Sequence, residues 1–233
     1  DQLFEELGVR VPIMVSGTIT DASGRTLTGQ TIEAFYASVS HLPLLSVGIN
    51  CALGSREMGQ YLRDLSPISR FFVSTHPNAG LPNEFGEYDE TAEFMASQAC
   101  GFIENGLVNI VGSCCGSTPV HTKAIADAVQ GMTPRKRTES GGNTLLSGLE
   151  LLEIRPDSNF INVGERTNVL GSRQFKRLIK EGKFEEAAEI GRLQVRNGAH
   201  ILDVCLQDPD RDEVADIIAF IPKLTRKIKA PLV

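Results

Sequence analysis

LLSVGINC at residues 44–51 and VNIVGSCCG at residues 108–116 are apolar runs rich in β-branched residues, and both end at cysteine. Similar runs occupy residues 13–19 and 71–76, and a helix-like segment follows each of the four runs. We expect these helices at residues 31–40, 55–65, 91–105 and 119–129. Strands that alternate with helices, over connections long enough for right-handed crossovers, predict an α/β fold with a parallel sheet.

A second series of strands and helices follows after residue 158. Strands are expected at residues 160–164 and 200–206, and at the C-terminal residues 230–233. Helices are expected at residues 172–182, 183–197 and 210–229, with Pro222 as a candidate interruption of the last.

Between the two series, residues 131–158 break the alternation of strands and helices, and they begin with GMTPRKRTESGGN (residues 131–143), a run of Pro, Gly and basic residues that has no apolar period. This composition favours a linker over a surface loop within one domain. We therefore divide the chain into residues 1–130, a linker over residues 131–158, and residues 159–233.

Cys51, Cys114 and Cys115 are predicted to lie together at two strand ends. Adjacent residues of a continuous strand point to opposite faces, so the CysCys pair could share one metal only where the strand breaks, which the flanking glycines allow. Zinc held by three thiolates keeps a fourth position open for a substrate. Such an anionic site is a poor Lewis acid for carbonyls but suits a thiol, which indicates alkyl transfer to sulfur.

Other interpretations of these residues remain open. A disulfide among the three cysteines is one, although no secretory signal is recognised at the start of the sequence. Cys100 and Cys205 belong to no cluster and are expected to be core residues. His76 ends the third apolar run and would close the metal site if it were a fourth ligand.

The composition argues against several classes of partner. The chain has 23 Lys and Arg against 29 Asp and Glu, and a net charge of -6 gives no reason to expect binding to nucleic acid or to a membrane surface. No apolar stretch approaches the roughly 20 residues of a spanning helix, and we expect a cytoplasmic protein. The basic residues 135–137 are expected to be solvated, His121 to start a helix and His200 to sit at a strand edge.

Several motifs carry a resemblance to a known family. GINC at residues 48–51, THPNAG at residues 75–80 and GSCCG at residues 112–116 resemble the homocysteine-binding barrel of cobalamin-dependent methionine synthases. FINVGERTN at residues 160–168 resembles the opening of their folate-binding barrel. The resemblance implies the (β/α)8 TIM-barrel type of fold. Because such a barrel takes about 250 residues, the chain would contain two incomplete barrels joined by the linker.

The resemblance also implies an activity, which is methyl transfer from 5-methyltetrahydrofolate through cobalamin to homocysteine in methionine biosynthesis. Zinc would be bound by Cys51, Cys114 and Cys115, with the homocysteine sulfur as its fourth ligand. Methylcobalamin would be bound by a module of the parent protein absent from this chain, since no Asp-x-His-x-x-Gly motif occurs here.

The implied substrate-binding residues form two groups, one for each barrel. For the first barrel, the implied residues are Thr18, Asp21 and Asn78. For the methyltetrahydrofolate (pterin) pocket of the second barrel, they are Glu165, Thr167, Asn168 and Asp203. Asn78 could approach the metal or the substrate, or could serve only a turn. Asp203 could instead be a structural carboxylate bonded to neighbouring backbone.

Two other functions remain open at this point. The chain could be a zinc-binding fragment that catalyses nothing because neither barrel is closed. It could also be a related zinc-thiolate methyltransferase that takes its methyl group from a corrinoid protein and uses another thiol. Ligation of homocysteine to zinc would separate these alternatives.

Overall fold

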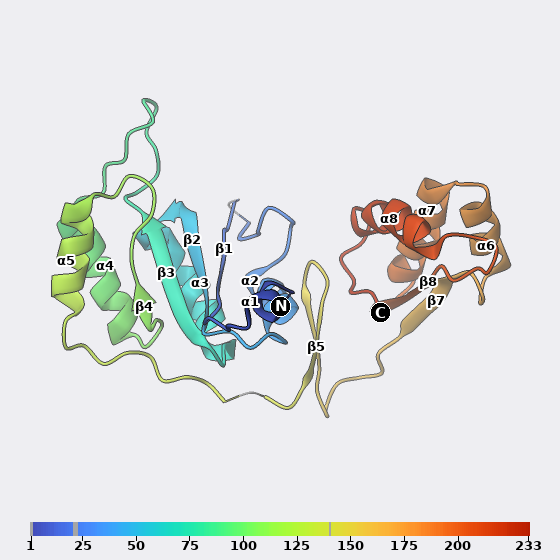
Figure 1. Ribbon diagram of the computed structural model, residues 1–233, viewed down its shortest axis with the longest axis horizontal. Helices are drawn as coiled ribbons and strands as arrows, with labels where there is room; N and C mark the ends of the chain where they lie inside the picture. The colour runs from blue at the N-terminus through green and yellow to red at the C-terminus, as the bar shows by residue number, and fades with distance from the viewer. Residues whose placement is uncertain (1, 21–22, 140) are drawn as a thin grey trace. The chain divides into compact units, whose positions relative to one another are not determined.

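The structure is a computed structural model that describes residues 2–20, 23–139 and 141–233. The chain divides into two compact units, Asp1–Gly141 and Gly142–Val233, which are described separately (Figure 1). Asp21, one of the predicted substrate-binding residues, lies outside the described residues.

The first unit contains a parallel sheet with the strand order β1-β2-β3-β4. The strands are β1 (Met14–Gly17), β2 (Ser46–Gly54), β3 (Phe72–Asn78) and β4 (Ile110–Val111). A helix follows each strand: α2 (Ile32–Val39), α3 (Ser55–Ile68), α4 (Ala92–Glu104) and α5 (Pro119–Val129). The predicted α/β fold with a parallel sheet is therefore confirmed, and a short additional helix, α1 (Gln2–Leu7), precedes the series.

Local sequence explains where these helices begin and which face they bury. Thr31 and Thr91 cap α2 and α4, because their hydroxyl groups accept hydrogen bonds from backbone N–H groups of the first turn. On α3, Met58, Leu62 and Leu65 recur at helical spacing and are almost fully buried. They belong to one apolar cluster with core residues of β2 and β3, which fixes α3 against the sheet.

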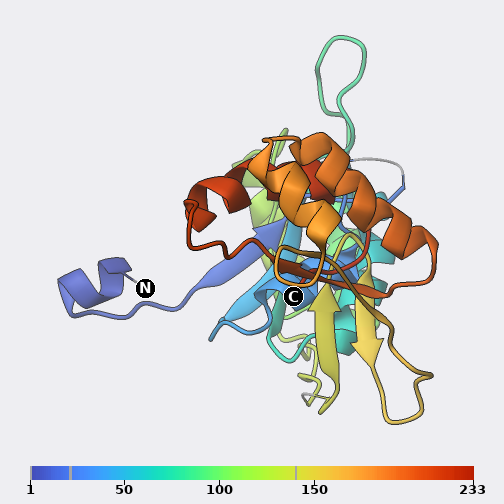
Figure 2. The same cartoon turned by 90° about the vertical axis from the view of Figure 1, so that its right-hand side faces the viewer.

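The second unit begins with an antiparallel hairpin, β5 (Thr144–Ser147) and β6 (Leu151–Ile154). It continues with two parallel strands, β7 (Val163–Asn168) and β8 (Ile201–Cys205), and with the helices α6 (Arg173–Lys180), α7 (Phe184–Arg196) and α8 (Glu213–Thr225). The hairpin falls inside the segment expected to be a linker. Figure 2 shows the helices of this unit over its strands, in orange and red.

The apolar core of the second unit includes a pair of aromatic rings from two helices. The rings of Phe175 on α6 and Phe220 on α8 meet edge to face with their centroids 5.2 Å apart.

Pro222 lies inside α8 without ending it, so the expected interruption at this residue is wrong. The C-terminal segment adds a parallel bridge from Leu232 to Leu202 of β8, where the sequence predicted a strand.

One expectation about charge is also wrong. Arg135, expected to be solvated, is only 5% exposed. Its guanidinium group donates hydrogen bonds to the backbone carbonyls of Ser66, Ser69 and Phe71 at and just beyond the C-terminal end of α3. Carbonyls at a helix C-terminus lack partners within the helix and favour a nearby cation, so this residue fastens the segment after α5 to the first unit.

Among the described residues, no helix combines the length and the apolar character needed to cross a lipid bilayer.

Candidate metal centre

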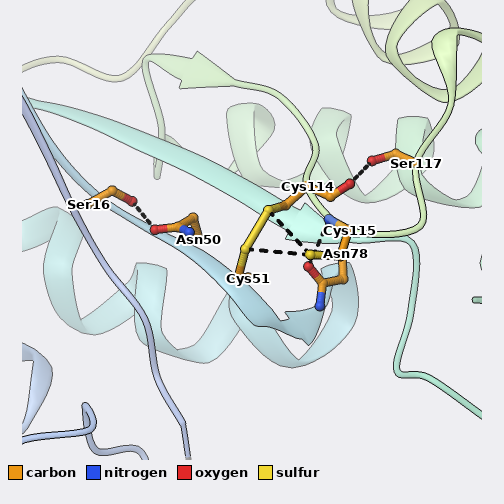
Figure 3. The surroundings of a disulfide bond; sticks show 7 residues. All are labelled: Ser16, Asn50, Cys51, Asn78, Cys114, Cys115 and Ser117. Carbon is orange, nitrogen blue, oxygen red and sulfur yellow. Dashed lines mark hydrogen bonds between the residues drawn. A yellow bond between two sulfur atoms is a disulfide. The ribbon is translucent and has the colours of Figure 1, made fainter. Parts of the chain in front are cut away.

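Cys51, Cys114 and Cys115 come together at the carboxyl end of the first sheet (Figure 3). Cys51 lies in β2, and the other two cysteines lie in the loop between β4 and α5. Within the described part of the chain, this is the one cluster of three or more His, Cys, Asp or Glu residues placed to hold a metal ion, with ligand atoms within 4.8 Å of one another.

The sulfur positions fit one metal ion only in part as they stand. Cys115 Sγ lies 4.0 Å from Cys51 Sγ and 3.9 Å from Cys114 Sγ. With Zn–S bonds of about 2.3 Å, two sulfur ligands of a tetrahedral zinc lie about 3.8 Å apart, which agrees with both distances. Cys51 and Cys114 are joined by a disulfide, one of the alternatives that the sequence left open. Since zinc binds thiolates, disulfide pairing and zinc ligation are alternative states of these two residues.

A bulge in β2 presents Cys51 to the other two cysteines. The register between β2 and β3 shifts after Asn50, so that three residues of β2 face a single residue of β3 before pairing resumes at Gly54. Cys51 and Ala52 have φ angles of 57° and 58°, in the left-handed region that side chains avoid. Each such residue costs about 1–2 kcal/mol, and residues in this conformation concentrate at functional sites because the surrounding structure holds them there.

The loop that carries Cys114 and Cys115 is fixed by hydrogen bonds to the end of β3. The Cys114 N–H donates to the Pro77 carbonyl over 2.8 Å, and the Ala79 N–H donates to the Cys115 carbonyl over 2.9 Å. The Cys115 N–H donates to Oδ1 of Asn78 over 3.1 Å. The structure therefore brings Asn78 to the cysteine cluster, where its buried side chain holds the ligand-bearing loop.

His76 does not belong to the cysteine cluster. Its ring packs against the backbone just after β4, where a Cβ atom on Gly112 would come within 2.6 Å of the imidazole Cδ2. Burial lowers the pKa of His76 below its ordinary value, which favours the neutral ring at physiological pH. Its position beside β4 offers no support for a fourth metal ligand.

The remaining histidines and cysteines have local structural contacts. His121 accepts a hydrogen bond from Thr118 N–H at the start of α5, as predicted for a helix start. Nδ1 of His200, just before β8, accepts a hydrogen bond from Asn162 N–H. Cys100 and Cys205 are half-buried and unpaired, and the Cys100 thiol faces the Ala128 carbonyl.

The sequence did not single out two polar residues on the strands beside the cluster. Ser16 of β1 donates a hydrogen bond to Oδ1 of Asn50 over 2.7 Å (Figure 3). Asn50 directly precedes Cys51. The alternation of side chains along the two expected strands was a signal in the sequence that could have placed Ser16 and Asn50 on the same face of the sheet. Thr18 follows β1 and is half-buried.

Three of the four residues predicted for the folate pocket meet in the second unit. Asn168 Nδ2 donates a hydrogen bond to Oδ2 of Asp203 over 2.8 Å, and Thr167 Oγ1 donates to the Asp203 carbonyl over 2.6 Å. Oδ1 of Asn168 also accepts from the backbone N–H groups of Leu170 and Gly171, which fixes the amide. Glu165 is exposed, and all of these residues lie within or beside β7 and β8. Glu165, Thr167 and Asn168 were expected just past a strand, but β7 runs through Asn168.

Comparison with known protein families assigns the first unit. Residues 2–129 match the family described as Homocysteine S-methyltransferase. The match runs from α1 to the end of α5, includes all three clustered cysteines, and covers more than half of the 233 residues.

Proposed function

Because this chain belongs to the homocysteine S-methyltransferase family, we propose that Cys51, Cys114 and Cys115 bind zinc and that the site activates the thiol of homocysteine for methyl transfer. The observation that carries the proposal is the convergence within 4.8 Å of three cysteine sulfurs, one from the bulge of β2 and two from the loop between β4 and α5. Membership of the family implies methyl transfer to homocysteine, and the proposal adds the three cysteines as the zinc ligands.

Zinc bound by three thiolates would hold the substrate thiol as a thiolate that remains nucleophilic. The protein's own contribution is to hold the three sulfurs at one side of a common centre. The β2 bulge sets the position of Cys51, and the hydrogen bonds to Pro77, Asn78 and Ala79 set that of the cysteine pair.

The site must also be reduced before it can act. The disulfide between Cys51 and Cys114 has to accept two electrons and two protons from a thiol reductant, by thiol–disulfide exchange, to give two thiols, which then lose their protons to become ligands. The proposal therefore includes a cytoplasmic location, where thiols are kept reduced.

Asn78 and Thr18 complete the proposed homocysteine site, and Asp21 belongs to it by the same resemblance. Asn78 is the better supported of these residues, because it is buried beside Cys115 and hydrogen-bonds to its backbone. From this position its amide could contact the metal or the substrate.

The finer proposal is that the chain is part of a cobalamin-dependent methionine synthase, in which 5-methyltetrahydrofolate is the methyl donor. The proposed fold is two incomplete (β/α)8 barrels, since each unit has parallel strands that alternate with helices. Support for a pterin site comes from the paired amide and carboxylate of Asn168 and Asp203. Such a pair offers donors and acceptors to one edge of a pterin ring. Methylcobalamin would come from a separate module.

Zinc content and zinc-edge X-ray absorption of the reduced protein, with and without homocysteine, test the proposal. We expect one zinc per chain, with three sulfur neighbours that become four when homocysteine is added. Cys115→Ser should lose zinc, whereas Cys100→Ser, a control outside the cluster, should keep it. Zinc that is absent, or already bound by four protein ligands, would refute a thiol-activating site and favour an inactive or structural fragment. Zinc with three sulfur ligands that responds to another thiol but not to homocysteine would favour the corrinoid-dependent alternative.

A further inference from the structure

Glu90 lies near the end of the loop between β3 and α4, directly before the N-cap residue of α4, and contacts the segment that follows Cys51. This loop projects beyond the end of β3 in Figure 1. The Glu90 carboxylate accepts a hydrogen bond from the hydroxyl of Ser55 over 2.5 Å and a longer one from the Ser55 N–H over 3.4 Å. Ser55 is the first residue of α3 and stands four residues after Cys51.

The carboxylate takes the place of a helix cap that the local sequence lacks. The N-cap position of α3 is Gly54, which has no side chain to accept a hydrogen bond. A negative charge at this end of a 14-residue helix is favoured by the helix dipole. The contact is also close, because a Cβ atom on Gly54 would lie 2.9 Å from Oε1 of Glu90.

The backbone of Glu90 is bonded to the segment directly after β3 and to the start of α5. Its N–H donates to the Ala79 carbonyl over 2.9 Å, and its carbonyl faces Nε2 of His121 over 3.0 Å. Ala79 in turn donates its N–H to the Cys115 carbonyl. His121 lies in the first turn of α5, the helix that follows the cysteine pair.

Glu90 is therefore bonded to residues that adjoin or contact both ligand-bearing segments. Its side chain bonds to Ser55, directly after the β2 bulge that presents Cys51. Its backbone bonds to Ala79, which in turn bonds to Cys115, and to His121 in the first turn of α5. Cys51 and Ala52 adopt left-handed backbone conformations that need such outside support.

We propose that Glu90 is a positioning residue for the metal site, which acts through Ser55 and the β2 bulge to hold Cys51 in register with Cys114 and Cys115. The inference rests on the proposed zinc site and adds a residue that contacts neither the metal nor the substrate. Outer contacts of this kind set the orientation of metal ligands and so govern affinity.

Zinc affinity, measured by competition with a chromogenic chelator on the reduced full chain, tests the inference. Glu90→Ala should lower the affinity by about 10- to 100-fold, in the range seen when outer partners of metal ligands are removed. Glu90→Gln keeps an oxygen that accepts from Ser55, although the bond is weaker without the charge, and should recover about half of the loss on a logarithmic scale. In the cobalt-substituted protein, Glu90→Ala should also change the visible absorption of the tetrahedral ion.

Two further variants separate positioning from a general loss of structure. Glu84→Ala removes an exposed carboxylate from the same loop and should leave zinc affinity unchanged. Ser55→Ala removes the other half of the hydrogen bond and should lower the affinity, while the double variant should lose no more than Glu90→Ala alone.

The outcomes distinguish the inference from the proposed function. Zinc binding by the wild type, together with a Glu90→Ala affinity within about twofold of it, would overturn the inference and leave the proposed function intact. Equal losses for Glu90→Ala and Glu84→Ala, or fully additive losses for Glu90→Ala and Ser55→Ala, would also overturn it. A wild type that binds no zinc would overturn both.

Discussion

Replacement of Arg135 by methionine should destabilise the first unit. The guanidinium group is buried and donates to the carbonyls of Ser66, Ser69 and Phe71, and also to the hydroxyls of Ser66 and Thr138. Methionine fills a similar volume but donates no hydrogen bond. In Arg135→Met, three backbone carbonyls at the end of α3 would therefore lose a charged partner.

The size of the effect follows from two opposing contributions. Each carbonyl left without a partner costs about 1–3 kcal/mol, so three cost about 3–9 kcal/mol. The substitution also removes the cost of keeping a charged group out of water, which is several kcal/mol. The expected net loss in the free energy of unfolding is about 2–4 kcal/mol. At a urea m-value of about 2 kcal/mol/M, the unfolding midpoint should fall by about 1–2 M.

Tyrosine fluorescence measures this loss in the first unit alone. The chain has no tryptophan and three tyrosines, Tyr36, Tyr61 and Tyr88, which all lie in that unit. Lys136→Met removes the same charge from an exposed neighbour and is the matched control. Equal urea midpoints for Arg135→Met and Lys136→Met would refute the reasoning, because removal of the buried charge would then cost no more stability than removal of the solvated one.

Three other substitutions have defined outcomes. Gly48→Ala would place a Cβ atom 2.1 Å from a backbone carbonyl oxygen of β3, so the urea midpoint of the first unit should fall, and an unchanged midpoint would contradict this contact. Asn78→Ala removes the acceptor for the Cys115 N–H and should weaken zinc binding by about 10-fold or more in chelator competition; equal affinities would argue against its role. A backbone N–H and the nearby lysines hold the pKa of Asp208 below its ordinary value, so its charged form adds stability that is present above a pH of about 4 and is lost as the pH falls through the folded pKa. The free energy of unfolding of the second unit, measured by hydrogen exchange, should then fall more steeply with decreasing pH below about 4 in the wild type than in Asp208→Asn. Identical pH profiles of the two proteins would exclude this contribution.

The alternating strands and helices of the first unit were predictable from sequence because each element carries its own signal. Threonines that cap α2 and α4, and apolar residues at helical spacing on α3, agree with the fold that forms. The expected cysteine cluster follows from the same logic, since parallel strands carry their carboxyl ends to one edge of the sheet.

Features that depend on distant contacts could not be predicted in the same way. The backbone carbonyls that accept from Arg135 lie 64 to 69 residues earlier in the chain, and a basic run gives no sign that one of its members is buried. The bulge at Cys51 has no glycine at its left-handed positions, so it carries no local signal. Glu90 meets Ser55 across 35 residues, and the hairpin of β5 and β6 was hidden by the Gly- and Pro-rich residues before it.

The hydrogen bonds between the cysteine loop and the end of β3 also bear on the thermodynamics of metal binding. In a zinc finger, the ion must order its own ligands, so folding and binding are a single event. Here Pro77, Asn78 and Ala79 hold the Cys114–Cys115 backbone through the protein's own structure, and the ordering entropy of the loop is lost during folding. The reduced apoprotein would therefore act as a preorganised host, with a small heat-capacity change and little change in circular dichroism when zinc binds.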